Sequence, residues 1–375
     1  MAHTFSVEQK AVLSLLASMQ PICSKRTTLD ATTNILFHIG HKELVLKATD
    51  LEISLQVHCP LLTSNIEEAR SFLVHGKRIF DIVKELEGDI AFTLTDSQLT
   101  IQANAVNVSL NIKSAEEFPP FPERIENLMQ LDTQLLLGML DKVSFLIPQN
   151  NANPALNGLL IEINQQELKM TSTDGHCLAQ VTTTACTLGQ ERVWLLPRRA
   201  IFEMKKLTET EKQEAVFLGV CGNQLVFSGQ AFNFFTKLLG DKFPQYQSIM
   251  NKEGFAPATL DRSRLIKTLR RSACLLSGQF LATSFGFGKD KVHVAMHNKE
   301  VGKLEEDVPL IEFNGQELDI RFYSPYLLNG LQTFSDDQVT CYLNNPSRPI
   351  IFEMDKDHYH VTYLVMPVSP TAHTQ

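Results

Sequence analysis

The sequence contains no long hydrophobic run. Its longest apolar stretches, such as residues 135–140, are far shorter than the roughly 20 residues that a helix needs to cross a membrane. The first six residues have neither the basic region nor the apolar core of a secretory signal. With 43% hydrophobic and 20% charged residues, the 375-residue chain has the composition of a globular protein with two or three domains. We therefore expect a globular protein without a signal peptide.

Patterns typical of metal sites and disulfide frameworks are also missing. The seven cysteines form no CxxC pair and have no regular spacing, which favours a reducing cytoplasm. The eleven histidines include no pair at helical metal-ligand spacing. His358 and His360 would share one face of a strand, where a solvent-facing pair is a simpler explanation than a metal site. We expect no metal, no cofactor and a cytoplasmic location.

The sequence has no helix-turn-helix or finger signature, and no alternation of aromatic and basic residues like that of single-strand binders. Although the net charge is −8, residues 261–274 hold five basic side chains against one acidic, and residues 198–206 hold four against one. Lys77 and Arg78 begin a corresponding helix earlier in the chain. One such cluster would be explained by a solvated helix face, but three favour contact with the phosphates of a polyanion, without sequence readout.

The sequence repeats with a period of about 124 residues. Asp50, Asp174 and Asn298 follow one another at that spacing, each at the end of a strand-like segment. The Phe-Pro pair at 118–119 recurs at 243–244, and the last copy ends at Met-Pro, 366–367. A repeat this long holds its own core, so it predicts three similar domains rather than a solenoid. We place them at residues 1–127, 128–255 and 256–375.

Each copy is predicted to contain two helices and several meandering strands. This order favours an α+β fold of antiparallel sheets with helices on one face. Strands at the ends of the copies could pair across copies. Hydrophobic spacing predicts helices at 7–20 with Ser6 as N-cap, after Gly76, at 135–143, from Pro197 and at 265–276, and strands at 35–39, 51–57, 106–112, 159–163 and 292–296.

The segment Thr173-Asp174-Gly175-His176-Cys177 combines an acid, an imidazole and a thiol. A Cys-His hydrolase is one interpretation, with Cys177 as nucleophile and His176 as base. Neighbouring side chains in an extended segment point to opposite sides, however, and the Thr-Asp pair recurs at 49–50 without His or Cys. An Asp at a strand end can accept hydrogen bonds from nearby backbone N–H groups. We therefore interpret the segment first as a structural turn, and expect no enzymatic activity.

Several motifs resemble those of one family. Thr173-Asp174-Gly175-His176-x-Leu178-Ala179, Leu156-Asn157-Gly158, Phe243-Pro244-x-Tyr246 and Tyr363-x-Val365-Met366-Pro367 resemble segments of the bacterial sliding clamp, the β subunit of DNA polymerase III. The resemblance covers essentially the whole chain. It implies a homodimeric, head-to-tail ring of six domains around double-stranded DNA, with helices inside and sheets outside. It also implies a non-enzymatic processivity factor that docks linear peptides of polymerase subunits, the clamp loader and repair proteins.

The resemblance also implies which residues contact partners. The peptide-binding cleft would contain Leu156, Thr173, Gly175, His176, Leu178, Pro244, Ile249, Tyr326, Leu364, Met366, Pro367 and Val368. DNA would contact Arg26, Lys77, Arg78, Arg198, Arg199, Lys205 and Lys206, and the dimer interface would contain Val108, Leu275 and Leu276.

The sequence departs from the family pattern near the cleft. Cys177 stands where many members have Arg, Ser369 stands where an Arg commonly follows the last apolar residue, and Tyr323 replaces a frequent Asn. These departures leave open a clamp paralogue with altered partner specificity.

Overall fold

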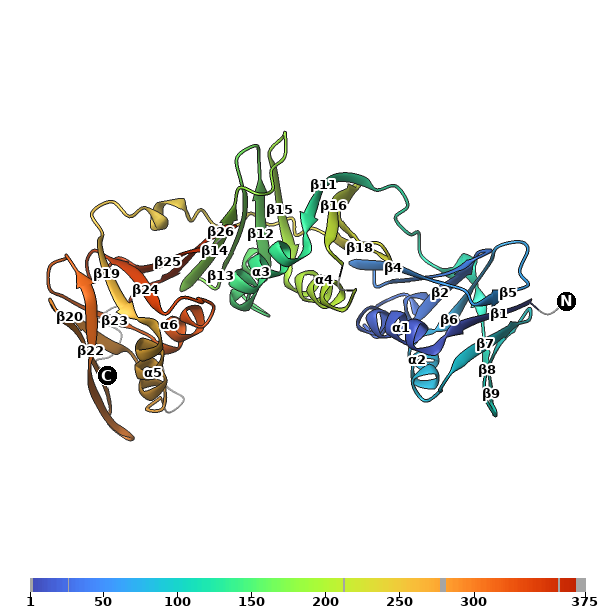
Figure 1. The fold of residues 1–375 in the computed structure, drawn as a ribbon, viewed down its shortest axis with the longest axis horizontal. Helices are drawn as coiled ribbons and strands as arrows, with labels where there is room; N and C mark the ends of the chain where they lie inside the picture. The colour runs from blue at the N-terminus through green and yellow to red at the C-terminus, as the bar shows by residue number, and fades with distance from the viewer. Residues whose placement is uncertain (1–2, 26, 212, 277–280, 357, 369–375) are drawn as a thin grey trace. The chain divides into compact units, whose positions relative to one another are not determined.

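The computed structural model describes residues 3–25, 27–211, 213–276, 281–356 and 358–368 (Figure 1). Contacts divide the chain into two compact units. Unit 1 contains residues 1–134 and 199–238, and unit 2 contains residues 135–198 and 239–375. All strand pairs in the described residues are antiparallel. The prediction of an antiparallel α+β fold is confirmed.

Unit 1 contains two sheets and helices that pack on them. In Figure 1, α1 (Gln9–Cys23) and α2 (Gly76–Lys84) lie side by side, and α1 packs against β3 (Glu43–Thr49) and β4 (Ile53–Pro60). The first sheet has the order β5 (Thr63–Ser64), β1 (His3–Glu8), β7 (Asp89–Leu94), β8 (Gln98–Ala103) and β9 (Val106–Asn111). The second has the order β10 (Lys113–Ser114), β6 (Arg70–His75), β2 (Asn34–Ile39), β3 (Glu43–Thr49), β4 (Ile53–Pro60), β18 (Phe232–Lys237), β17 (Gln224–Ser228), β16 (Ala215–Cys221) and β11 (Glu126–Asp132). The helices are α1 (Gln9–Cys23), α2 (Gly76–Lys84) and most of α4 (Arg198–Glu211).

Unit 2 is built on one twelve-stranded sheet. The sheet is covered in part by α5 and α6, which pack against each other. Its order is β15 (Arg192–Pro197), β12 (Gly158–Ile163), β13 (Leu168–Thr173), β14 (Cys177–Thr183), β26 (Tyr359–Val365), β25 (Ile350–Lys356), β24 (Gln338–Leu343), β19 (Ala256–Asp261), β22 (Gly302–Phe313), β21 (Lys291–Asn298), β20 (Thr283–Phe287) and β23 (Leu318–Phe322). The helices are most of α3 (Thr133–Val143), α5 (Arg262–Ala273) and α6 (Ser324–Leu331).

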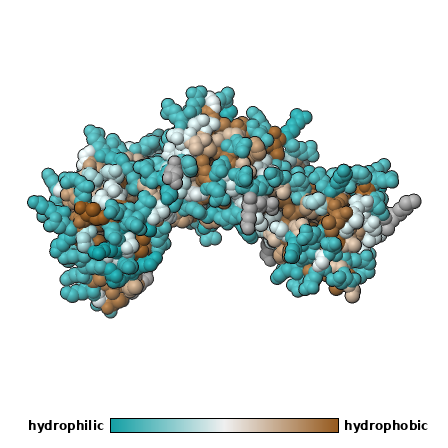
Figure 2. Space-filling model, viewed as in Figure 1, coloured by the Kyte–Doolittle hydropathy of each residue, from teal (hydrophilic) through white to brown (hydrophobic). Residues whose placement is uncertain are grey.

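Strands of different copies pair in both units, as expected. In unit 1, β4 of the first copy pairs with β18 of the second. In unit 2, β14 of the second copy pairs with β26 of the third. The two compact units therefore do not follow the copy boundaries, and the three-domain division stays a prediction. The surface in Figure 2 is mostly hydrophilic, with small hydrophobic patches. No helix in the described residues is both long and apolar enough to cross a membrane.

The ends of several elements differ from the sequence prediction. Ser6 is not a helix cap, because β1 runs through it and its hydroxyl lies 2.6 Å from that of Thr63 on β5. Leu51 is outside the strand predicted at 51–57 and takes a left-handed φ of 74°. Pro197 ends β15 one residue before α4 begins. The ends of helices and strands are the least predictable part of a sequence pattern. The Ser6 position is set by pairing with the distant strand β5, and the Leu51 position by the local hydrogen bonds of the Asp50 turn.

The 124-residue repeat reproduces one turn three times. The Oδ1 atom of Asp50 accepts hydrogen bonds from the backbone N–H groups two and three residues later, at 3.0 and 2.8 Å. Asp174 does the same at 2.8 and 2.7 Å, and Asn298 at 3.0 and 3.3 Å. The prediction that this motif is a structural turn is confirmed.

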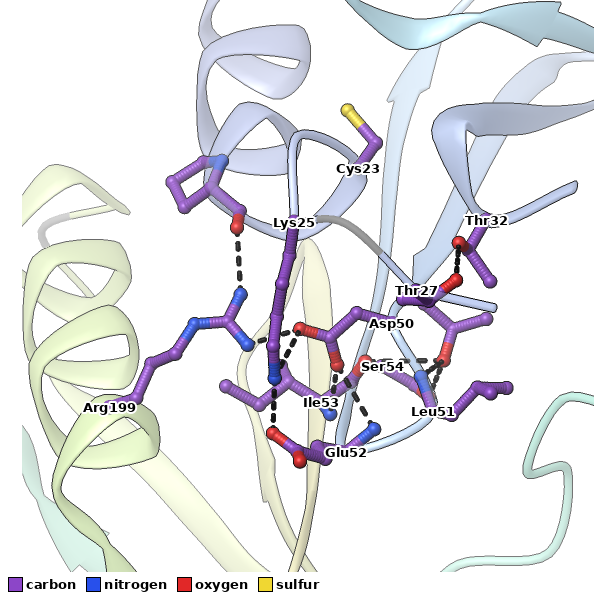
Figure 3. A network of polar contacts seen from close by, with 12 residues as sticks. Cys23, Lys25, Thr27, Thr32, Asp50, Leu51, Glu52, Ile53, Ser54 and Arg199 are labelled. Carbon is purple, nitrogen blue, oxygen red and sulfur yellow. Dashed lines mark hydrogen bonds and ion pairs between the residues drawn. The ribbon is translucent and has the colours of Figure 1, made fainter. Parts of the chain in front are cut away.

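In the first copy, the turn aspartate is also the centre of an ion-pair network in unit 1 (Figure 3). The Asp50 side chain is fully buried and its Oδ2 atom pairs with Arg199 of α4, while Lys25 lies 3.8 Å away. Arg199 also donates a 2.7 Å hydrogen bond to the carbonyl of Pro21 in α1, and Lys25 pairs with Glu52. One carboxylate thus joins α1, the turn after β3 and α4.

We predict that Asp50→Ala will lower the free energy of unfolding by about 2–3 kcal/mol, the range for losing hydrogen bonds to a charged group. The substitution removes two turn hydrogen bonds and leaves Arg199 without its carboxylate. Chemical denaturation followed by circular dichroism measures the change. The matched control is Asp96→Ala, which removes an exposed carboxylate from a surface turn and should change stability by less than about 0.5 kcal/mol. Equal stability of the two variants would contradict a structural role for the network.

Candidate functional site

The turn between β13 and β14 presents its residues to solvent. The hydroxyl of Thr173 accepts a 3.1 Å hydrogen bond from the N–H group of Gly175. The Oδ1 atom of Asp174 accepts hydrogen bonds from the N–H groups of His176 and Cys177. Gly175 has a φ of 94°, a conformation in which glycine is unstrained. Because the turn is fixed by its own hydrogen bonds, Gly175 and His176 remain exposed.

Residues from the third copy meet this turn. The N–H group of Met366, directly after β26, donates a 2.9 Å hydrogen bond to the carbonyl of His176. The His176 and Tyr326 rings are stacked, with centroids 5.5 Å apart and planes 17° apart. The hydroxyl of Tyr363 on β26 donates a 2.7 Å hydrogen bond to the carbonyl of Tyr326 and so ties α6 to the sheet. Three predicted residues from distant parts of the chain are therefore neighbours: His176, Tyr326 and Met366.

A buried hydrophobic cluster supports these residues. Leu178 and Leu364 are paired across β14 and β26, and both are 1% exposed. Ile249 and Met366 pack against the same cluster. Pro244 lies on the loop that covers it and lines a pocket of about 370 Å³ with Leu160, Leu195, Phe243 and Tyr246. Tyr246 is fixed there by a 2.6 Å hydrogen bond from its hydroxyl to Glu162.

The structure divides the twelve predicted cleft residues into two groups. Leu156, Leu178 and Leu364 are buried and support the others from below; Leu156 lies under the turn, 3.9 Å from where a side chain at Gly175 would begin. The remaining nine are partly or fully exposed, and we call them the docking surface. They are Thr173, Gly175, His176, Pro244, Ile249, Tyr326, Met366, Pro367 and Val368.

Cys177 and His176 do not form a nucleophile and base. The thiol is 1% exposed, and burial, with the negative charge of Asp174, raises the pKa of Cys177 far above its usual range. The His176 imidazole stacks on the ring of Tyr326, and in the described residues no hydrogen bond joins it to the thiol. A thiol that stays protonated at neutral pH is a poor nucleophile, which disfavours the hydrolase interpretation.

Basic residues lie exposed on three helices, opposite their buried faces. On α2, Lys77 and Arg78 are exposed while Ile79 and Val83 are buried, and Lys77 lies 3.4 Å from Asp81. On α4, Lys206 is exposed and Lys205 is half-buried. On α5, the basic cluster noted at 261–274 exposes four residues that the list of predicted DNA contacts lacks, and one of them, Arg271, is paired with Glu306. They are Arg264, Lys267, Arg270 and Arg271.

Other predicted DNA contacts are engaged within the protein. Arg199 is paired with Asp50, and the Nε atom of Arg198 donates a 2.9 Å hydrogen bond to the carbonyl of Ile147. Both remain predictions as DNA contacts, with part of their hydrogen-bonding capacity already used. Arg26 and Ser369 lie outside the described residues.

The predicted interface residues lie at element ends and edges. Val108 is half-buried on β9, an edge strand of its sheet. Leu275 and Leu276 are half-buried just after α5, which ends at Ala273 and not at residue 276 as predicted. An edge strand offers unpaired backbone groups to another chain.

In the described residues there is no cluster of His, Cys, Asp and Glu that could hold a metal ion. His360 instead lies 2.7 Å from Asp355.

Three family models match successive parts of the chain. They describe the N-terminal, central and C-terminal domains of the DNA polymerase III β subunit and cover residues 3–122, 130–245 and 247–369. The chain belongs to this family of sliding clamps. Its membership confirms the resemblance and assigns it to DNA replication as a sliding clamp.

Individual relatives align with this chain over nearly their whole length. The beta sliding clamp of Pseudomonas aeruginosa is 28% identical over 370 residues, covering 97% of this chain and 99% of the relative. That of Staphylococcus aureus is 23% identical over 373 residues, covering 97% and 98%. A crystal structure of the Pseudomonas aeruginosa DNA polymerase sliding clamp with ligand has a TM-score of 0.89 at 26% identity, covering 98% of this chain and 100% of that one.

We predict that iodoacetamide will modify Cys274 readily at pH 7.5 and leave Cys177 unmodified in the native protein. Cys274 is exposed, whereas Cys177 is buried and its pKa is raised. Peptide mass spectrometry over a time course measures both rates, and denatured protein provides the control in which every thiol reacts. Modification of Cys177 as fast as Cys274 would restore the hydrolase interpretation.

Proposed function

We propose that two copies of this chain close into a head-to-tail ring around double-stranded DNA and tether the replicative polymerase to its template. In this ring each copy contributes three domains, divided near residues 127 and 255. The observation that carries the proposal is that three clamp domains follow one another along the chain and cover nearly all of it. The protein would act in the cytoplasm, by binding alone and without catalysis.

The charge distribution supports contact with DNA through phosphate groups. The chain is acidic overall, at −8, yet α2, α4 and α5 expose basic residues. Repeated basic faces on an otherwise acidic protein favour contact with a polyanion at those helices. Phosphates are the same in every sequence, so we expect binding without base preference.

The docking surface supports recognition of short linear peptides. It combines exposed apolar side chains with an adaptable methionine, Met366, above a rigid buried floor. Such a surface can accept leucine and phenylalanine anchors of several partners. We propose that polymerase subunits, the clamp loader and repair proteins bind here.

We predict that deletion of residues 366–375 will weaken binding of a peptide with leucine and phenylalanine anchors at least tenfold from a micromolar Kd, or about −8 kcal/mol. The deletion removes Met366, Pro367 and Val368 from the docking surface and leaves β26 intact. Fluorescence anisotropy measures the affinity. Deletion of residues 370–375 is the matched control and should bind like the full chain. Unchanged affinity after the longer deletion would show that the peptide binds elsewhere.

We predict that protein loaded by its clamp loader will stay on nicked circular DNA in 0.5 M salt and dissociate once the DNA is cut. High salt weakens phosphate contacts, whereas a closed ring is held by topology. The double variant Leu275→Ala, Leu276→Ala should elute as a folded monomer and should not be retained, because burial of a leucine contributes about 2–5 kcal/mol. Light scattering and gel filtration measure both properties. Equal retention on circular and linear DNA would contradict encirclement.

A further inference from the structure

The three repeated turns differ in what their Asp or Asn side chain contacts besides the backbone of the turn. Asp50, Asp174 and Asn298 use Oδ1 in the same way, to accept two backbone N–H groups. Asn298 carries no charge, and its amide group donates a 2.7 Å hydrogen bond to the carbonyl of Leu275. The two aspartates each have a second oxygen, Oδ2, and a negative charge that the turn itself does not use.

The first aspartate has its cations within the protein. Oδ2 of Asp50 pairs with Arg199, and Lys25 lies 3.8 Å away. Pro197 and Phe322 end corresponding strands, so the residue that corresponds to Arg199 in the third copy is Ser324, which carries no charge. Among the described residues, no hydrogen bond or ion pair reaches Oδ2 of Asp174. That oxygen is also absent from the buried polar atoms without a partner, so solvent can reach it.

This uncompensated carboxylate lies at the docking surface. Asp174 is bonded to the N–H group of His176, whose ring stacks on Tyr326, and Tyr323 packs against Tyr326 at 4.9 Å. Asp174 also acts on the neighbouring Tyr326 ring. The pKa of Tyr326 is raised to about 12, mainly by burial and then by the negative charge of Asp174. None of the nine residues of the docking surface is Lys or Arg. A negative charge beside aromatic rings favours a planar cation, which can bond to the carboxylate and stack on a ring.

We propose that Asp174 binds a basic residue of the docked peptide, arginine in preference to lysine. The partner supplies in trans the cation that Arg199 supplies to Asp50 within the chain. This inference rests on the proposed peptide-docking function and adds to it a charge preference: peptides with leucine and phenylalanine anchors bind more tightly when an arginine lies beside them.

A series of peptide pairs and two protein variants test the proposal. All peptides share leucine and phenylalanine anchors, and the two members of each pair hold either arginine or its neutral isostere citrulline at one flanking position, which differs from pair to pair. Asp174→Asn removes the charge and keeps the Oδ1 acceptor, and Asn298 shows that an asparagine supports this turn. Asp89→Asn, on an exposed strand end of unit 1, is the control for net charge.

On the unaltered protein and on Asp89→Asn, we expect the arginine peptide to bind about three- to fivefold more tightly than the citrulline peptide at the best position, as for a partly exposed ion pair. Raising the salt from 50 to 500 mM should reduce the difference. On Asp174→Asn the two peptides should bind equally, with the citrulline peptide unchanged, which shows that the surface is intact.

Other outcomes distinguish failure of the role proposed for Asp174 from failure of the docking function. If both peptides bind but arginine gives no advantage at any position, or keeps its advantage on Asp174→Asn, the role of Asp174 is wrong and the docking function stands. If neither peptide binds the unaltered protein, the docking function fails and the inference fails with it.

Discussion

Backbone pairing between β14 and β26 holds the candidate docking site together. These strands belong to different copies of the repeat, and the register aligns Leu178 with Leu364. The pairing places the turn at 173–177 beside the residues that follow β26, so that Met366 bonds to His176. A register shift of one residue in either strand would turn its leucine to the opposite face of the sheet and disrupt the floor of the site. The buried cluster that specifies this register therefore also positions the exposed residues above it.

The repeat shows how one local structure serves different purposes. The same turn is an internal ion-pair centre at Asp50, a neutral connection at Asn298 and, at Asp174, a half-buried corner next to the exposed Gly175 and His176. The difference comes from the following copy, which supplies Arg199 to the first turn and has the uncharged Ser324 at the corresponding position for the second. The first turn is closed by charges within the protein, whereas the second retains a charge and aromatic rings at the surface. This contrast is the physical reason for proposing the second turn as a docking site.

The repeat, the helical faces and the turn could be predicted from the sequence, because all three depend on residues close together in the chain. A side-chain oxygen two or three residues from its N–H donors needs no distant partner. Alternating burial on helices such as α2 depends only on the 3.6-residue period. The family could also be identified, since its motifs are short and local. None of these features depends on how distant parts of the chain pack.

Tertiary structure alone decided which predicted residues are available. The sequence analysis placed Arg199 among the predicted DNA contacts and Leu178 among the predicted cleft residues, and both stay predictions. Only the structure shows that Arg199 is paired with Asp50 and that Leu178 lies in the core. The sequence pattern made Ser6 a plausible helix cap, but in the structure it lies in β1, which pairs with β5. The uncompensated charge of Asp174 is visible only when compared with Asp50 in space. Asp50 and Arg199 are 149 positions apart, and Ser6 and Thr63 are 57 apart. Local sequence patterns carry no information about which residues that far apart meet.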